Sequence, residues 1–153
     1  MLVDIVDVGC RCDTDDMEQR LSFITLAVSD VSRSRAFYVD GLRWRPLFDN
    51  DEVLMLPVAD RLILSLWSTE GFTAEIGEAP ASGIAPITLS HNVQTEAEAD
   101  AVLAEAERIG APVSSAVRRS WGGYSGYFTD PDGFRWEVAV NPGETGEFVL
   151  PPR

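Results

Sequence analysis

The chain has 153 residues, the size of one ordinary domain, and 45% of them are hydrophobic, which is enough for a core of its own. Its formal net charge of −13 argues against a nucleic-acid partner, because binding to a phosphate backbone needs clustered cations. No apolar stretch approaches the roughly 18 residues of a membrane span, and the first residues do not resemble a secretory signal. We therefore expect a cytoplasmic protein that binds neither nucleic acid nor a membrane.

Residue usage narrows the chemistry further. All 12 basic residues are arginines, and without a lysine amine the chain can form neither a Schiff base nor a Walker-type phosphate loop. The two cysteines, Cys10 and Cys12, stand in a C-x-C near the N-terminus. A zinc site wants about four ligands, and two cysteines make no disulfide framework, so we interpret both as incidental.

The first structural pattern follows an acidic, irregular N-terminal extension, residues 1–20. Ser22–Val28 is rich in β-forming residues and predicts a strand. Residues 33–40 predict a helix that ends at Gly41, a residue suited to the left-handed conformation that often follows a helix. Two further strands, joined as a hairpin, are predicted next: Val53–Val58 and Arg61–Trp67.

The same pattern recurs in the second half of the chain. Pro86–His91 (PITLSH) echoes the FITLAV of the first strand, and Thr95 with Glu98 predicts a capping box for a second helix. Gly110 ends this helix as a glycine ends the first. Three strands follow, the last two joined by an Asp-Pro-Asp-Gly turn: Pro112–Arg118, Tyr124–Thr129 and Phe134–Val140.

The second half follows the order strand–helix–strand–strand–strand, and the first half shows the same order with one of its four strands not located. The repeat predicts an α+β fold with two tandem βαβββ modules and a mixed sheet. A single domain is expected over residues 21–142, followed by an irregular C-terminal tail, residues 143–153. The domain is expected to contain module 1 at about 21–69, a linker at 70–83 and module 2 at about 84–142.

Successive residues of a strand face opposite sides of a sheet, so the first strand of each module has two distinct faces. The larger apolar residues belong under the helices, and the smaller, more polar face is the predicted wall of a pocket. Four residues of that face are predicted to contact a ligand: Phe23, Thr25, Thr88 and Ser90. In the last strand, Glu137 alternates with apolar neighbours and is predicted to point into the same pocket.

Glu137 is the candidate catalytic residue, and two interpretations of it remain open. Its carboxylate can act as a general base or anchor a cationic ligand group, or it can simply hold neighbouring strands by hydrogen bonds. His91, the one histidine, can serve as acid or base, but its place at a strand end on the helix-facing side favours a structural role, with a bond to the loop backbone around Asn92. Trp121 and Tyr124 flank a glycine pair and are predicted to form a pocket wall or lid, with edge packing as the alternative.

Two segments carry a family resemblance. ITLAVSDVSRSRAFYVDGLRW and GGYSGYFTDPDGFRWEVAVNP resemble the opening and the closing of the vicinal oxygen chelate superfamily. This superfamily includes glyoxalase I, extradiol dioxygenases, fosfomycin-modifying thiol transferases and bleomycin-resistance proteins. The resemblance covers about residues 20–142. It implies a curved sheet around a pocket, and a homodimer, because the family commonly builds its cavities between subunits.

The resemblance does not carry over the usual metal site. Metal-dependent members place His or Glu at four inward positions, which motif matching puts on Phe23, Leu64, Pro86 and Glu137. Only the last of these can bind a metal ion, and one carboxylate is too few for a catalytic divalent ion. We therefore expect no metal ligand set and no other cofactor.

Two function hypotheses follow. The first is a metal-free protein that binds a small cationic or aromatic compound, as in the bleomycin-resistance branch. The alternative is a glyoxalase-like lyase or isomerase, or a dioxygenase, with Glu137 as its base or its sole retained metal ligand. A third hypothesis is a degenerate domain that has lost its chemistry and is kept for interaction with a partner.

Overall fold

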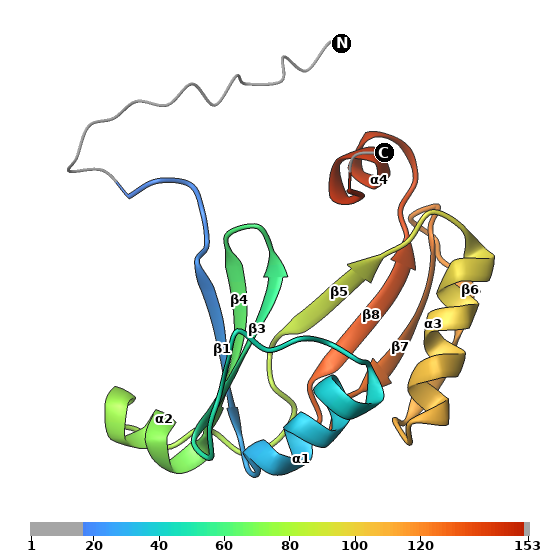
Figure 1. Cartoon of the computed structure of the whole chain (residues 1–153). Coiled ribbons are helices and arrows are strands. Elements are labelled where there is room, and N and C mark those ends of the chain that lie inside the picture. The colour runs from blue at the N-terminus through green and yellow to red at the C-terminus, as the bar shows by residue number, and fades with distance from the viewer. Residues whose placement is uncertain (1–16, 152–153) are drawn as a thin grey trace.

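The computed structural model describes residues 17–151, which form an α+β fold with two four-stranded sheets (Figure 1). The first module contains β1 (Phe23–Val28), α1 (Val31–Arg35), the π-helical segment η1 (Ala36–Gly41), β2 (Phe48–Asp49), β3 (Val53–Ala59) and β4 (Leu62–Ser68). After α2 (Thr69–Ile76), the second module contains β5 (Thr88–Asn92), α3 (Glu96–Arg108), β6 (Val113–Arg118), β7 (Tyr124–Thr129) and β8 (Arg135–Val140). The last element is α4 (Gly143–Val149).

The two predicted βαβββ modules are confirmed, and each forms a mixed sheet of its own. The strand orders are β1-β4-β3-β2 and β5-β8-β7-β6. In each sheet the first strand pairs in parallel with the last, and the remaining pairs are antiparallel. In the described part of the chain, β1 and β5 therefore each keep one edge without a partner strand.

Local capping residues define the helices as the sequence predicts, with one exception. The Thr95 hydroxyl accepts from the Glu98 N–H while the Glu98 carboxylate accepts from the Thr95 N–H, and Gly110 follows α3 at φ 92°. The left-handed ending predicted at Gly41 is wrong. There the helix widens into η1, and the residue with a positive φ is Arg43, at 62°.

Two segments predicted to be irregular contain helices instead. α2 occupies the first half of the predicted linker, where the Ser68 hydroxyl accepts from the Gly71 N–H and caps it. α4 occupies most of the predicted tail, although two glycines in seven residues give it low intrinsic helix propensity. Cys10 and Cys12 lie outside the described residues. Within 17–151, no helix is both long and apolar enough to cross a bilayer.

One apolar core runs through both modules. α1 packs on β3 and β4, α3 packs on β6, β7 and β8, and their buried side chains form a single cluster. Aromatic rings make the connection between the modules: Tyr38 lies against Trp44 and Trp136, and Phe128 stacks on Trp136 with the ring planes 5° apart. The two modules therefore fold around a shared core rather than as independent units.

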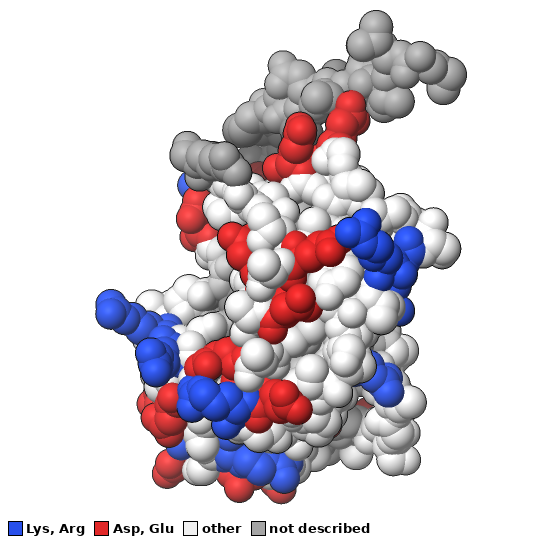
Figure 2. Space-filling model, turned by 90° about the vertical axis from the view of Figure 1, so that its right-hand side faces the viewer, with Lys and Arg blue, Asp and Glu red and all other residues white. Residues whose placement is uncertain are grey.

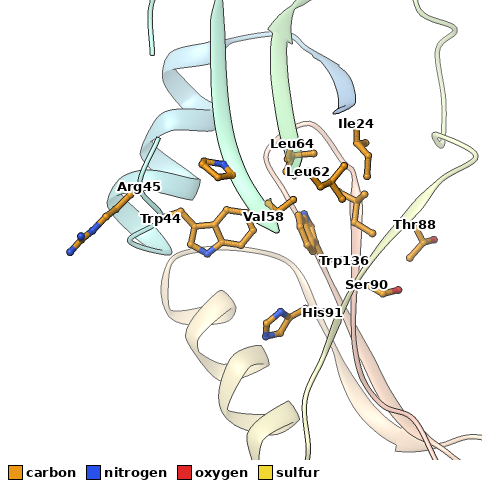
Figure 3. A pocket seen from close by; sticks show the side chains of 12 residues that line it. Ile24, Trp44, Arg45, Val58, Leu62, Leu64, Thr88, Ser90, His91 and Trp136 are labelled. Atoms are coloured by element: carbon orange, nitrogen blue, oxygen red, sulfur yellow. The ribbon is translucent and has the colours of Figure 1, made fainter. Parts of the chain in front are cut away.

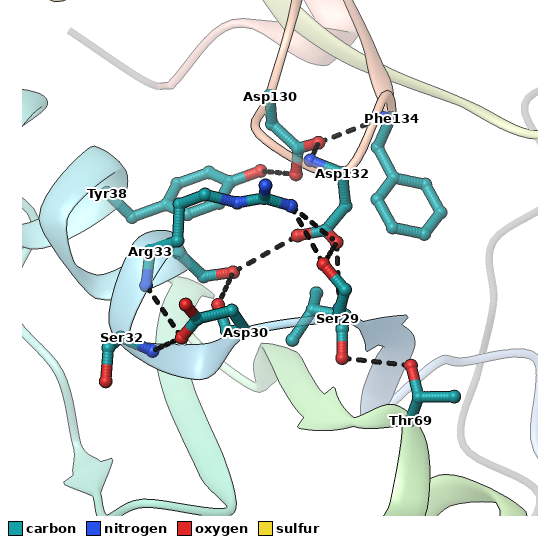
Figure 4. Close-up of polar contacts among 11 residues, drawn as sticks. Ser29, Asp30, Ser32, Arg33, Tyr38, Thr69, Asp130, Asp132 and Phe134 are labelled. Carbon is teal, nitrogen blue, oxygen red and sulfur yellow. Dashed lines mark hydrogen bonds and ion pairs between the residues drawn. The ribbon is translucent and has the colours of Figure 1, made fainter.

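A buried chain of hydrogen bonds fixes this contact (Figure 4). Asp130 begins the predicted Asp-Pro-Asp-Gly turn, and its Oδ1 accepts from the backbone N–H groups of Asp132 and Phe134, both at 2.9 Å. Its Oδ2 accepts from the Tyr38 hydroxyl at 2.7 Å, and that hydroxyl accepts from Trp136 Nε1–H at 3.0 Å. The turn of module 2 is thus bonded directly to the helix of module 1.

Asp132 adds a second set of bonds from the same turn. Its Oδ1 accepts from the backbone N–H and the hydroxyl of Ser29, both at 2.8 Å, and pairs with the Arg33 guanidinium at 3.3 Å. Burial raises the pKa of the Asp130 carboxyl, and burial together with that carboxylate raises the pKa of Tyr38. The phenol therefore remains a protonated donor over the whole physiological pH range.

Tyr38→Phe is expected to lower the free energy of unfolding by about 2–4 kcal/mol, because it leaves a buried carboxylate oxygen and a buried indole N–H without partners. Urea denaturation measures this loss. Tyr124→Phe is the matched control, because its hydroxyl donates to Asp100 in an exposed contact at 2.8 Å. The control is expected to cost about 0.5 kcal/mol or less. Equal losses in the two variants would contradict a role of the buried chain in joining the modules.

Candidate functional site

A cavity of about 830 Å³ lies between the two modules (Figure 3), within the range of roughly 300–1,000 Å³ typical of small-molecule sites. Both modules contribute to its walls. Its lining consists of Ile24, Trp44, Arg45, Pro57, Val58, Leu62, Leu64, Thr88, Leu89, Ser90, His91 and Trp136.

Module 1 supplies an almost wholly apolar wall. Ile24 comes from β1, Val58 from β3, and Leu62 and Leu64 from β4. Parallel pairing sets Ile24 beside Leu64, so the two side chains lie on the same face of the sheet. These four side chains give a ligand apolar surface, and Arg45, in the loop after η1, is the one charged side chain that the described part of module 1 adds to the lining.

Module 2 supplies the uncharged polar groups of the described lining, and these come from one strand. Four consecutive residues of β5 line the cavity, Thr88 to His91. Consecutive side chains point to opposite faces, so all four can line one space only where that space follows the free edge of the strand. The unpaired backbone N–H and C=O groups of this edge are then available to a ligand as well.

Two tryptophans form the aromatic part of the cavity. Trp44 follows η1 and packs edge-to-face on Trp136, with ring centroids 5.6 Å apart and ring planes at 83°. Trp136 is only 7% exposed and is held by Tyr38 and Phe128, as described above. These contacts fix the rings before any ligand arrives, which reduces the entropy lost on binding.

His91 stands at the rim of the cavity, where its side chain remains open to solvent. Partial burial nevertheless lowers the pKa of its imidazole below the ordinary 6.5, so the ring is neutral at pH 7. Among residues 17–151 it makes no side-chain hydrogen bond, and the predicted bond to the loop near Asn92 does not form. A neutral His91 can both donate and accept a hydrogen bond.

The structure brings only some of the predicted ligand residues to this cavity. Thr88 and Ser90 line it, whereas Phe23 and Thr25 lie on the other face of the first sheet and are exposed. Trp121 is exposed before β7. Tyr124 faces α3, where its hydroxyl donates to Asp100. The strand faces were assigned correctly, but the cavity lies between two sheets, mostly on their helix-facing sides, and not in the hollow of a single curled sheet.

Glu137 does not line the cavity, because it points to the opposite side of its sheet from Trp136. Its Oε2 accepts from the Ser90 hydroxyl at 3.2 Å, and its Oε1 accepts from the Tyr127 hydroxyl at 3.0 Å. Burial and this hydrogen bond raise the pKa of Tyr127, whose ring also carries the Arg119 guanidinium 5.8 Å from its centroid. This geometry matches the predicted strand-holding role, and a role as base stays a prediction.

The strand register revises the predicted metal positions. Glu137 is paired with Ser90, and the equivalent pair in module 1 is Trp67 with Ala27. Trp67 therefore takes the position first assigned to Leu64, whose side chain points to the other face and into the core. Over residues 17–151, no group of three His, Cys, Asp or Glu side chains could hold a metal ion. The residues present do not fit the usual ligand set of the superfamily.

The sequence alone did not predict several of the residues that line the cavity. Trp44 and Arg45 lie in a loop without periodicity, and Val58 and Leu62 flank a hairpin turn. Their only shared property is that the packing of the two modules brings them together. A local signal for such residues does not exist in one sequence.

Comparisons with known proteins agree with this architecture. The profile of the Glyoxalase/Bleomycin resistance protein/Dioxygenase superfamily matches residues 20–138. A glyoxalase-related enzyme from Fulvimarina pelagi is 32% identical with a TM-score of 0.75, over 82% of this chain and 90% of that one. No protein with a curated description matched.

Two more distant structures support the fold. Lactoylglutathione lyase from Agrobacterium tumefaciens is 22% identical with a TM-score of 0.65, over 81% of this chain and 95% of that one. A glyoxalase/bleomycin resistance protein/dioxygenase from Nocardioides is 17% identical with a TM-score of 0.68, over 86% and 93% of the two chains. The profile match covers well over half of the sequence, and the chain therefore belongs to the glyoxalase/bleomycin resistance protein/dioxygenase superfamily.

Proposed function

We propose that this protein binds a small apolar or aromatic molecule in the cavity between its modules, without a metal ion. The observation that carries the proposal is a preformed cavity of about 830 Å³ with two fixed tryptophans and a few polar groups along one strand edge. Apolar walls with a small number of polar groups are the usual composition of small-molecule sites.

The lack of a metal ligand set supports binding over the metal-assisted chemistry of other superfamily members. At the equivalent positions, Phe23, Trp67 and Pro86 have no side-chain atom that ligates a metal. The superfamily takes its name from bleomycin-resistance proteins as well as from enzymes. Sequestration of a small compound is the function that these residues support best.

The proposal includes a cytoplasmic homodimer. Leu21 and Phe23, in and just before β1, are 64% and 50% exposed, beside a strand edge that has no partner in residues 17–151. Exposed apolar residues next to a free strand edge favour burial against a second chain.

Binding is best tested with an uncharged aromatic probe, 2-naphthylmethanol, by isothermal titration calorimetry on the full chain. Trp44→Ala is expected to weaken binding roughly tenfold or more, because it removes an aromatic wall of the cavity. Val58→Trp, at a residue 40% exposed on the cavity rim, is expected to block the cavity without loss of fold. Trp121→Ala, at an exposed tryptophan away from the cavity, is the matched control and should bind as the wild type does.

Circular dichroism and thermal melting of each variant separate lost binding from lost folding. Unchanged affinity in both Trp44→Ala and Val58→Trp would show that the cavity is not the binding site. No detectable binding to the wild type by this probe or by a wider aromatic panel would remove the proposal.

Metal analysis tests the other half of the proposal. After dialysis, the purified full chain is expected to hold far less than one Ni, Zn, Fe or Mn ion per molecule by mass spectrometry. A stoichiometric ion that Glu137→Gln releases would contradict the proposal. The double variant Cys10→Ser with Cys12→Ser serves as the control, because it reveals any ion held by the N-terminal cysteines instead.

One observation favours a second function, catalysis by Glu137. Its carboxylate is partly buried and held in place by two hydroxyl groups, which is how a positioned general base is built. The similarity to a lactoylglutathione lyase suggests the hemithioacetal of methylglyoxal and glutathione as the assay substrate.

We expect no turnover of that hemithioacetal above the buffer rate, with or without added metal ions. Should the wild type turn it over, and should Glu137→Gln lower the rate by about 100-fold or more, the binding proposal would give way to the catalytic one. Glu144→Gln, at an exposed acid in α4, is the control for a general effect of lost negative charge.

A further inference from the structure

We infer that the cavity takes an aromatic or branched apolar compound that carries an anionic group, and that Arg45 sets this preference. The inference rests on the proposed function and narrows its ligand class. It also departs from the cationic ligand that the overall acidity of the chain favours.

The acidic residues of this chain avoid the cavity. The sequence holds 25 acids against 12 basic residues, yet no Asp or Glu of residues 17–151 is among the cavity-lining side chains. The acidity gathers on outer surfaces instead. α3 alone carries five carboxylates, and Figure 2 shows acidic side chains spread over the side of the molecule where α3 lies. The net charge therefore says little about the ligand.

Among residues 17–151, Arg45 is the one permanently charged residue of the lining. Five other described arginines pair with acidic residues, but Arg45 has neither an ion pair nor a hydrogen bond within 17–151. Its backbone is anchored by Trp44, which packs on Tyr38 and Trp136. In Figure 3 its guanidinium extends away from the cavity into solvent. An exposed side chain of this length changes rotamer within nanoseconds, so it can turn toward a bound anion.

A cationic ligand would find no matching charge. Glu137 is hydrogen-bonded to the lining residue Ser90, but it lies on the far side of the sheet, and its two oxygens already accept from Ser90 and Tyr127. The aromatic rings do not form a cation cage either. One face of Trp136 is stacked on Phe128, and Trp44 packs against Trp136 edge-to-face. A cation would lose its hydration without an equivalent partner.

The remaining polar groups of the lining can donate hydrogen bonds to a neutral or negatively charged oxygen of a ligand. The Thr88 hydroxyl and the neutral imidazole of His91 can each donate one hydrogen bond, and neither brings a negative charge. The cavity thus offers apolar surface, hydrogen-bond donors and one unpaired guanidinium, which together describe a site for an aromatic carboxylate or a similar anion.

Three probes with one aromatic body test the inference: 2-naphthoate, 2-naphthylmethanol and 2-naphthylmethylammonium. Their dissociation constants are measured with the full chain by isothermal titration calorimetry at low salt. We expect the carboxylate to bind about three- to fivefold more tightly than the alcohol, as one rim ion pair allows, and the ammonium to bind least tightly. Added salt should reduce this difference.

Arg45→Gln should remove the preference for the carboxylate over the alcohol. Arg43→Gln, at an exposed arginine that does not line the cavity, should keep the wild-type order. Equal binding of the three probes, or tightest binding of the ammonium, would overturn the charge preference and leave the proposed function standing. A preference that persists in Arg45→Gln would overturn the role of Arg45, and binding of none of the probes would overturn both proposals.

Discussion

The structure depends on one buried chain of hydrogen bonds, from the Trp136 indole through the Tyr38 hydroxyl to the Asp130 carboxylate. It joins the last hairpin of module 2 to the first helix of module 1. A carboxylate left unpaired in this place would be costly, so the modules can pack in only one relative position. The same hydrogen bonds hold the ring of Trp136 in place, and this ring forms part of the aromatic wall of the cavity.

The fixed position of the modules explains why a cavity exists at all. Each module forms a four-stranded sheet, and within the described residues its first strand has no partner on one side. The free edge of β5 then faces the apolar wall from β1, β3 and β4, and the space between them is the cavity. A ligand there meets apolar side chains on one side and strand-edge polar groups on the other. The site forms where the two modules pack together, and neither module contains it alone.

The two faces of the second sheet divide the chemistry. On one face, Trp136 and His91 belong to the cavity; on the other, Glu137 is bonded to Ser90 and Tyr127. The superfamily signature ending in Glu137 therefore lies behind the cavity wall and not in the cavity. Because of this separation, binding in the cavity and catalysis by Glu137 are distinct proposals that separate variants can test.

The sequence by itself determined the two βαβββ modules, the capping box at Thr95 and the Asp-Pro-Asp-Gly turn, because periodicity, caps and turns depend on neighbouring residues. Its missed helices, α2 and α4, are short and contain glycine, so intrinsic helix propensity gives little sign of them. Only the tertiary structure decided which face holds the cavity and that Trp44 and Arg45 belong to it. Those facts follow from the contact between two modules, and a contact between distant segments leaves no local pattern in the chain.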